Sequence, residues 1–136
     1  MTTDSIETSE HEAVPLNKPV ADSEVPNRGP RITPADVEAN ISGEHYFTAL
    51  QGVQGARGGY TSEDGVSLGL LTFCVLVLDN GFTVTGESAC AAPENFRADI
   101  GKRIARANAV QKIWPLMGYE LRTRLADDGL GENPFD

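Results

Sequence analysis

Few side chains in this sequence of 136 residues are arranged for covalent chemistry. The nearest approach is the run Gly86-Glu87-Ser88-Ala89-Cys90, which resembles a nucleophile elbow but has Cys90 at the position of the final glycine. No histidine follows Ser88 in the chain, so a serine triad is not supported. We therefore expect that the protein is not an enzyme.

The histidines and cysteines do not form a metal-binding pattern either. His11 lies in the N-terminal segment, His45 stands alone, and Cys74 and Cys90 are scattered. Zinc and related metals need several such ligands at short, defined spacings. We expect no metal site and no cofactor, and we interpret His45 as an ordinary, partly buried side chain.

Basic side chains gather between residues 97 and 124, although the net charge of the chain is −9. One interpretation is a solvated helix face, and the other is a site for phosphates. A basic helix in an otherwise acidic protein suits a small, localised anion better than a long polyanion. The basic residues are Arg97, Lys102, Arg103, Arg106, Lys112, Arg122 and Arg124, opposed only by Asp99 and Glu120.

Residues 51–67 are rich in glycine, and we predict a flexible loop or lid there. No Gly-Lys-Ser/Thr sequence follows, so this stretch is not a phosphate-binding loop of the known kind. Arg57 within it is either a solvated side chain or, if the loop folds over a ligand, a bidentate partner for phosphate.

Both ends of the chain are acidic. Residues 1–30 contain many acidic residues and prolines but few large apolar side chains, so we predict a disordered tail. Residues 127–136 are expected to form a second acidic tail, which leaves residues 31–126 as a single domain. We find no secretory signal and no apolar run long enough to cross a bilayer.

A hairpin is the clearest local structure in that domain. The apolar run 68–78 is followed by Asn80-Gly81, a pair that tolerates positive φ and forms two-residue turns. The strand 82–90 should return beside it. The first strand is apolar on both faces, so we expect a helix to cover one face and a second subunit the other.

The hairpin register bears on the two cysteines. With a two-residue turn, Cys74 faces Glu87 and Cys90 faces Leu71. The thiols are then not cross-strand partners, so we expect no disulfide. Reduced cysteines fit an intracellular setting.

Helices are expected on both sides of the hairpin. Thr33-Pro34-Ala35-Asp36 has the residues of a helix start, and this short helix should stop near Ser42-Gly43, whereas residues 44–50 are ambiguous between helix and strand. The fold class is therefore α+β, with an antiparallel hairpin or small sheet packed against a long C-terminal helix and a short N-terminal helix.

The long helix begins near Ala92-Pro93, and Pro115 should kink or end it, with Tyr119 to Leu125 as a short strand or helical turn. Spacings of three, four and seven residues predict one buried stripe and an opposite, exposed side. The stripe comprises Phe96, Ile100, Ile104, Ala107 and Trp114, and the opposite side carries Lys102, Arg106, Ala109 and Ile113.

Several blocks of this domain resemble a known family. They are Leu-Leu-Thr-Phe-Cys-Val-Leu before the turn, Asn-Gly-Phe-Thr-Val-Thr-Gly-Glu-Ser-Ala-Cys after it, Pro93-Glu94-Asn95-Phe96, Ile100 to Ala105, and Lys112-Ile113-Trp114 through Gly118-Tyr119. The resemblance is to the small family of tailed-phage proteins found in coliphage and Shigella phage genomes, of the N-four gp forty-nine and Sf-six gene sixty-six type. It spans about the whole predicted domain.

The same blocks are also similar to those of the type-one Thoeris anti-defence phage proteins. Those proteins sequester cyclic nucleotide signals, such as glycocyclic ADP-ribose and cyclic oligonucleotides, without cleaving them, and they assemble into dimers and larger oligomers. The similarity therefore implies binding of a small cyclic nucleotide in the host bacterial cytoplasm by a homodimer or higher homo-oligomer. Pro115 and the long acidic N-terminal tail depart from the pattern.

Under this resemblance seven residues have candidate roles in ligand binding. Each also has a structural interpretation: Asn95 as a helix cap, the phenylalanines as core and the arginines as a solvated face. The candidates are Asn95 for a base edge or ribose, Phe82 or Phe96 for stacking on adenine, Arg57, Arg103 and Arg106 for the pyrophosphate, and Ser88 as a core or pocket-lining hydroxyl.

Two classes of function remain open. The first is a phage-encoded protein that sequesters a small cyclic nucleotide without turnover. The second is a scaffold or interaction protein of phage infection, whose basic helix meets an acidic protein partner or nucleic acid. Binding of small cyclic nucleotides discriminates between them.

Overall fold

The structure is a computed structural model that describes residues 29–57 and 64–129. The predicted acidic tails and the middle of the predicted glycine-rich loop lie largely outside these ranges. The described elements are α2 (Pro34–Ala39), β1 (Ile41–Thr48), α3 (Ala49–Arg57), α4 (Gly65–Gly69), β2 (Leu71–Leu78), β3 (Thr83–Ala89), the 3₁₀ helix η2 (Pro93–Asn95) and α5 (Ala98–Asp127).

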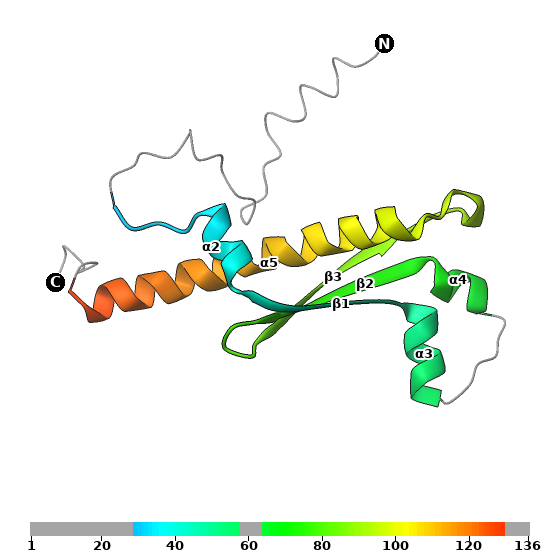
Figure 1. The fold of residues 1–136 in the computed structure, drawn as a ribbon, viewed down its shortest axis with the longest axis horizontal. Helices are drawn as coiled ribbons and strands as arrows, with labels where there is room; N and C mark the ends of the chain where they lie inside the picture. Colours follow the sequence, from blue (N-terminus) through cyan, green and yellow to red (C-terminus); the bar gives the residue numbers. More distant parts are fainter. Residues whose placement is uncertain (1–28, 58–63, 130–136) are drawn as a thin grey trace, which may run out of the picture.

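The three strands form an antiparallel sheet in the order β1-β2-β3, and α5 lies along one face of it (Figure 1). This arrangement confirms the predicted α+β class, with its small sheet, long C-terminal helix and short N-terminal helix. It also resolves the ambiguity of residues 44–50, because residues 44–48 belong to β1 and residues 49–50 begin α3.

The two faces of the sheet differ in their cover. On β2, Thr72, Cys74, Leu76 and Leu78 are buried beneath α5, whereas the residues between them are only half-buried. We call the face beneath α5 the covered face and the other the open face. The open face consists of Gly43, His45 and Phe47 on β1, Leu71, Phe73, Val75 and Val77 on β2, and Thr83, Thr85, Glu87 and Ala89 on β3.

Small residues let α5 approach the sheet closely. Gly101, Ala105 and Ala109 recur at four-residue spacing on the buried side of the helix. Opposite them on β3 is Gly86, where an added Cβ would collide with the backbone of α5 at the Ala105 carbonyl oxygen and the Ala109 nitrogen. The helix and strand therefore pack backbone to backbone, which only glycine permits at this position.

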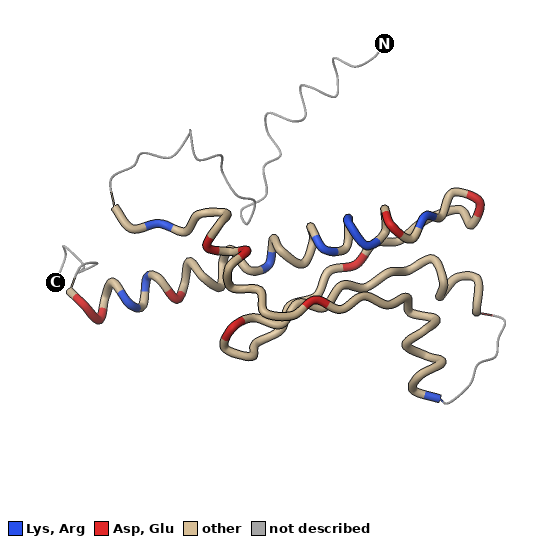
Figure 2. Tube along the Cα trace, in the orientation of Figure 1, with Lys and Arg blue, Asp and Glu red and all other residues tan. Residues whose placement is uncertain are grey.

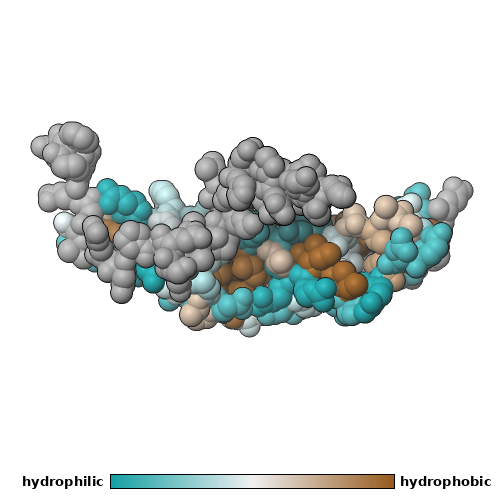
Figure 3. Space-filling view, turned by 90° about the horizontal axis from the view of Figure 1, so that it is seen from above, coloured by the Kyte–Doolittle hydropathy of each residue, from teal (hydrophilic) through white to brown (hydrophobic). Residues whose placement is uncertain are grey.

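The prediction for the buried side of α5 is wrong: the residues that face the sheet come about one position later in the sequence than the predicted stripe. Ala109 and Ile113, expected on the exposed side, are fully buried, whereas Ile104 is 44% exposed and Ala107 is exposed. The prediction followed the largest apolar side chains, but close packing on a sheet selects the smallest. Seen from the side of α5, hydrophobic areas accordingly lie between hydrophilic ones in the middle of the molecule (Figure 3).

Of the two alternatives predicted for Pro115, a kink or an end of the helix, the end is wrong. α5 continues through Pro115 to Asp127 and includes the segment 119–125. Proline removes one backbone N–H donor. Because Pro115 is exposed, the carbonyl that loses its partner can be hydrated. Buried Ile113 before it and partly buried Met117 after it pack in or against the core and hold the helix together.

The hairpin forms as predicted, but its register differs by one residue. Leu78 N–H donates to the carbonyl of Phe82 at 2.8 Å, so the loop has three residues, and Gly81 adopts φ of +92°. A type I turn followed by a left-handed glycine gives this three-residue form. Cys74 consequently faces Gly86 rather than Glu87. Both cysteines are free, as expected.

The predicted loop 51–67 is partly helical. α3 begins with a reciprocal cap, in which Gln51 N–H donates to Thr48 Oγ1 at 3.1 Å and Thr48 N–H donates to Gln51 Oε1 at 2.9 Å. The predicted cap at Thr33 is present in the N-terminal helix, and Asp36 makes it reciprocal by accepting from Thr33 N–H. This helix ends at Ala39, earlier than predicted, because β1 begins at Ile41.

Replacement of Gly86 tests the close contact between β3 and α5. Gly86→Ala should lower the free energy of unfolding by roughly 3 kcal/mol, because the methyl group meets backbone that cannot move aside. The matched control is Gly118→Ala in α5, where an added Cβ meets nothing within 4 Å, and it should be neutral or stabilising by about 0.5–1 kcal/mol. Urea unfolding measures both, and equal stabilities of the two variants would refute the contact.

Candidate functional site

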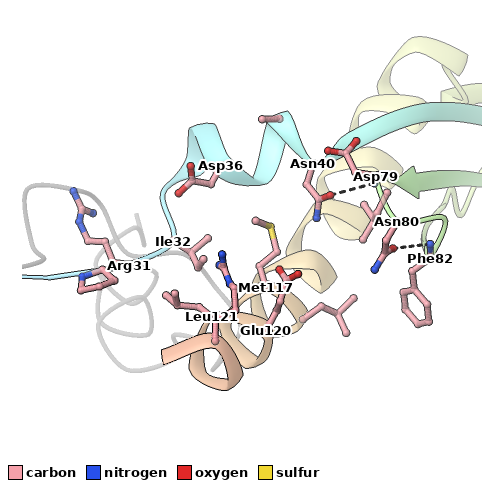
Figure 4. A pocket seen from close by; sticks show the side chains of 15 residues that line it. Arg31, Ile32, Asp36, Asn40, Asp79, Asn80, Phe82, Met117, Glu120 and Leu121 are labelled. Carbon is pink, nitrogen blue, oxygen red and sulfur yellow. Dashed lines mark hydrogen bonds between the residues drawn. The ribbon is translucent and has the colours of Figure 1, made fainter. Parts of the chain in front are cut away.

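A pocket of about 720 Å³ lies at the end of the molecule where the β2–β3 turn, α2 and the C-terminal half of α5 meet (Figure 4). Pockets for small organic ligands are usually of this size, about 300–1,000 Å³. The pocket exists because α5 continues past Pro115 and so provides one wall beyond the end of the sheet.

The interior of the pocket is apolar. Ile32, Met117 and Leu121 lie together between α2 and α5 (Figure 4). Leu78 contributes from the end of β2, and Leu116, which is 39% exposed, from α5. These side chains can cover the nonpolar part of a ligand.

Phe82 stands at one end of the pocket, directly after the hairpin turn (Figure 4). Its side chain is 56% exposed, which is unusual for phenylalanine. The turn itself is fixed, because Asn80 Oδ1 accepts a hydrogen bond from Phe82 N–H at 2.9 Å. An aromatic face is therefore held in the solvent beside the pocket.

Two carboxamides line the same end. Asn40 Oδ1 accepts a hydrogen bond from Asp79 N–H at 3.1 Å, and Asn80 uses its oxygen within the turn. Each carboxamide also has an NH₂ group, which can donate to carbonyl, hydroxyl or ring-nitrogen acceptors. The turn thus brings an aromatic ring and hydrogen-bond donors together.

Charged side chains of both signs complete the lining. Arg31 and Arg124 provide guanidinium groups, and Asp36, Asp79 and Glu120 provide carboxylates. Asp36 is engaged in the cap of α2, where hydrogen bonds from Thr33 lower its pKa. The pocket can therefore bind a ligand that carries both anionic groups and hydrogen-bond donors.

A second polar cluster lies near the middle of α5. Arg106 binds two carboxylates: its Nη2 is 2.8 Å from Glu38 Oε1 on α2 and 2.9 Å from Glu44 Oε2 on β1. Tyr46 Oη donates to Glu44 Oε1 at 2.9 Å, and Lys102 Nζ is 5.9 Å from the centre of the Tyr46 ring. Acidic residues of α2 and β1 thus lie beside basic residues of α5 (Figure 2).

The pKa values in this cluster reflect its hydrogen bonds. Arg106 lowers the pKa of both Glu38 and Glu44, and the two carboxylates raise that of Arg106. Burial, followed by the hydrogen bond to Glu44, raises the pKa of Tyr46, and burial raises that of the Cys74 thiol. The cluster therefore stays ionised at neutral pH and joins α2 and β1 to α5.

The predicted site residues are not brought together. Phe82 lines the pocket, and Arg106 is bound by Glu38 and Glu44. Asn95 and Phe96 lie at the opposite end of the molecule, in the connection from β3 to α5 (Figure 1). Of the other predicted residues, Arg57 ends α3, Ser88 is half-buried on the covered face of β3, and Arg103 is exposed on α5.

Several residues that line the pocket were not predicted as site residues from the sequence. Met117, Glu120 and Arg124 lie beyond Pro115, where the helix was predicted to kink or end. Asn40 was assigned to a helix that in fact ends before it. A helical period continued through Pro115 would have placed Met117, Leu121 and Arg124 on one side of α5.

The described residues contain no group of three or more histidine, cysteine or carboxylate side chains that could hold a metal ion. None of the described helices is long and apolar enough to cross a membrane.

The structure therefore defines a small α+β protein, with a three-stranded antiparallel sheet, one long helix and a pocket at one end. Residues 32–125 match the phage protein (N4 Gp49/phage Sf6 gene 66) family, and the chain belongs to that family. The match covers most of the described chain and confirms the tailed-phage resemblance. No curated protein and no solved structure matches the chain significantly.

The Arg106 cluster should make stability depend on pH. The folded-state pKa values of Glu38 and Glu44 lie below their ordinary value of 4.5. The two ion pairs with Arg106 therefore stabilise the folded state above pH 4.5, and this stabilisation is lost as the pH falls through the folded-state pKa values. Arg106→Gln should cost on the order of 1 kcal/mol near neutral pH, because solvent screens carboxylates that are a third to a half exposed.

Thermal unfolding at several pH values measures this effect. The difference between wild type and Arg106→Gln should shrink as the pH falls below 4.5 and vanish below the folded-state pKa values, where the carboxylates are protonated in both proteins. Arg103→Gln, at an exposed arginine of the same helix, is the control and should change stability little at any pH. A difference for Arg106→Gln that is independent of pH would contradict the assignment.

Proposed function

We propose that the protein is a phage-encoded, non-enzymatic binding protein that sequesters a small cyclic nucleotide signal and so blocks a host anti-phage defence in the bacterial cytoplasm. The ligand is of the glycocyclic ADP-ribose or cyclic oligonucleotide type. The observation that carries the proposal is the pocket at the end of α5 with the exposed ring of Phe82 beside it. Membership of a phage protein family supports a role in phage infection. The choice of ligand class rests on the resemblance of the sequence blocks to Thoeris anti-defence proteins.

The lining residues can contact the base, the ribose and the phosphate of a nucleotide. Phe82 offers a face for a base, and stacking of a base on an aromatic side chain contributes about 1–3 kcal/mol. Asn40 and Asn80 offer donors for a base edge or ribose, and Arg124 can contact phosphate. Glu120 can accept hydrogen bonds from ribose hydroxyls.

The chemistry of the lining supports binding without turnover. Among the described residues, those that line the pocket include no histidine, cysteine, serine or lysine. His45, the histidine in the described part of the chain, lies on the open face of the sheet. The pocket therefore offers contacts for a nucleotide but no nucleophile paired with a base.

Calorimetry of the full chain with glycocyclic ADP-ribose and cyclic oligoadenylates tests the proposal. We expect saturable binding of one of these ligands and recovery of the intact nucleotide after heat denaturation of the complex. A cleaved product would show that the protein is an enzyme. No binding across the panel would refute sequestration and favour a scaffold or interaction protein that meets an acidic partner or nucleic acid.

Phe82→Ala should weaken that binding about tenfold or more, because base stacking is lost. Its melting temperature should change little, since the ring is 56% exposed. Tyr119→Ala is the matched control: Tyr119 is an aromatic residue of α5 that is 78% exposed and does not line the pocket, so its loss should leave affinity unchanged. Equal effects of the two substitutions would place the ligand elsewhere.

A further inference from the structure

The chain turns off the axis of α5 directly after the helix ends. Gly129 adopts φ of +79°, and its N–H donates to the carbonyl of Ala126 at 3.2 Å. Both features belong to the Schellman motif, in which the residue after the glycine packs on an apolar residue of the last helical turn. The residue after the glycine is Leu130, and the matching helical position holds Leu125, which is half-buried. Leu125 follows the pocket residue Leu121 by one turn, so both lie on the same side of α5.

The part of the pocket nearest to this turn combines apolar and basic side chains. Ile32, Met117 and Leu121 form its interior and are half-buried (Figure 4). Arg124 is exposed and forms no ion pair within the described part of the chain. Such a surface fits a short peptide that carries an acidic and an aromatic side chain.

We propose that residues 130–136 fold back along α5 and occupy the pocket of the same chain, so that a ligand has to displace them. The segment reads Leu-Gly-Glu-Asn-Pro-Phe-Asp. Glu132 pairs with Arg124 at the near end of the pocket. The ring of Phe135 lies on Met117 and adds to the apolar interior.

The spacing of the segment fits the length of the pocket. Helical residues rise 1.5 Å each, so Arg124 lies about 8 Å and Met117 about 18 Å from Gly129 along α5. An extended chain spans about 3.3 Å per residue, so Glu132 reaches back about 10 Å and Phe135 about 20 Å. The acidic and the aromatic residue therefore meet their partners in the order in which the pocket presents them.

A weak contact is sufficient to fill the pocket. The lining also holds the carboxylates of Asp36, Asp79 and Glu120, which repel an acidic segment. A connection of a few residues, however, gives an effective concentration of about 1 mM. A contact with a dissociation constant in that range then fills the pocket for much of the time, and a ligand of higher affinity displaces the segment.

The N-terminal segment is a poorer occupant, although it also joins the described chain beside the pocket, near Pro30. Residues 22–28 read Asp-Ser-Glu-Val-Pro-Asn-Arg and contain no aromatic side chain. Arg28 would also bring a like charge beside Arg31 and Arg124. The C-terminal segment has an aromatic ring and no basic residue.

NMR of the isotope-labelled full chain without any ligand tests the contact. We expect nuclear Overhauser effects between the ring of Phe135 and the methyl group of Met117. Phe135→Ala should shift this methyl resonance, whereas Asn133→Ala in the same segment should not. Absence of these effects, or effects only between labelled and unlabelled copies, would overturn the proposal. A methyl shift that follows charge reversal at Asp22 and Glu24 but not Phe135→Ala would assign the pocket to the N-terminal segment instead.

Exchange of the two charges tests the pairing of Glu132 with Arg124. Arg124→Glu should release the segment and move the Met117 methyl resonance toward its position in Phe135→Ala. Glu132→Arg in the same chain should bring the resonance back, because the pair is then re-formed with opposite signs. Failure of this second substitution to restore the resonance would contradict the pairing.

The consequence for ligand binding rests on the proposed function. Because the ligand displaces the segment, Phe135→Ala should raise the affinity for glycocyclic ADP-ribose or cyclic oligoadenylates about three- to tenfold in calorimetry. Unchanged affinity would overturn the role of the segment as a competitor and leave the nucleotide site intact. If none of these nucleotides binds, the proposed function fails, and the contact of Phe135 with Met117 decides this inference by itself.

Discussion

The backbone contact between α5 and β3 is the constraint on which the rest of the structure depends. Gly86 on the strand meets Ala105 and Ala109 on the helix without room for a side chain between them. This contact fixes the height of α5 above the sheet and the side that it turns inward. Larger residues of the helix, such as Ile104, consequently lie outside the core.

Both the open face of the sheet and the pocket follow from this arrangement. One helix can cover only one face of a narrow sheet, so the other face of β2 is left with apolar side chains and no covering layer. The same helix is longer than the strands, and beyond the sheet it meets α2 and the hairpin turn to form the pocket. Near the middle of α5, Arg106 joins α2 to the helix through Glu38 and joins β1 to it through Glu44.

Much of the fold could be predicted from local sequence signals, but less of the candidate site. The cap at Thr33 and the hairpin at Asn80-Gly81 are decided by neighbouring residues, and the structure has both. The side of α5 that is buried depends on how closely β3 approaches the helix at Gly86. The spacing of apolar residues along the helix does not reveal this distance. Pocket residues such as Asn40 and Arg124 come from segments far apart in the sequence, and only the tertiary fold brings them together.

The central claim is that a nucleotide binds beside Phe82, at the end of α5. NMR titration of the isotope-labelled protein with glycocyclic ADP-ribose and cyclic oligoadenylates locates binding most directly. The account predicts chemical-shift changes concentrated at the hairpin turn, α2 and the segment of α5 around Met117 and Glu120. Changes confined to Asn95 and Arg103, or no changes with any of these nucleotides, would contradict it.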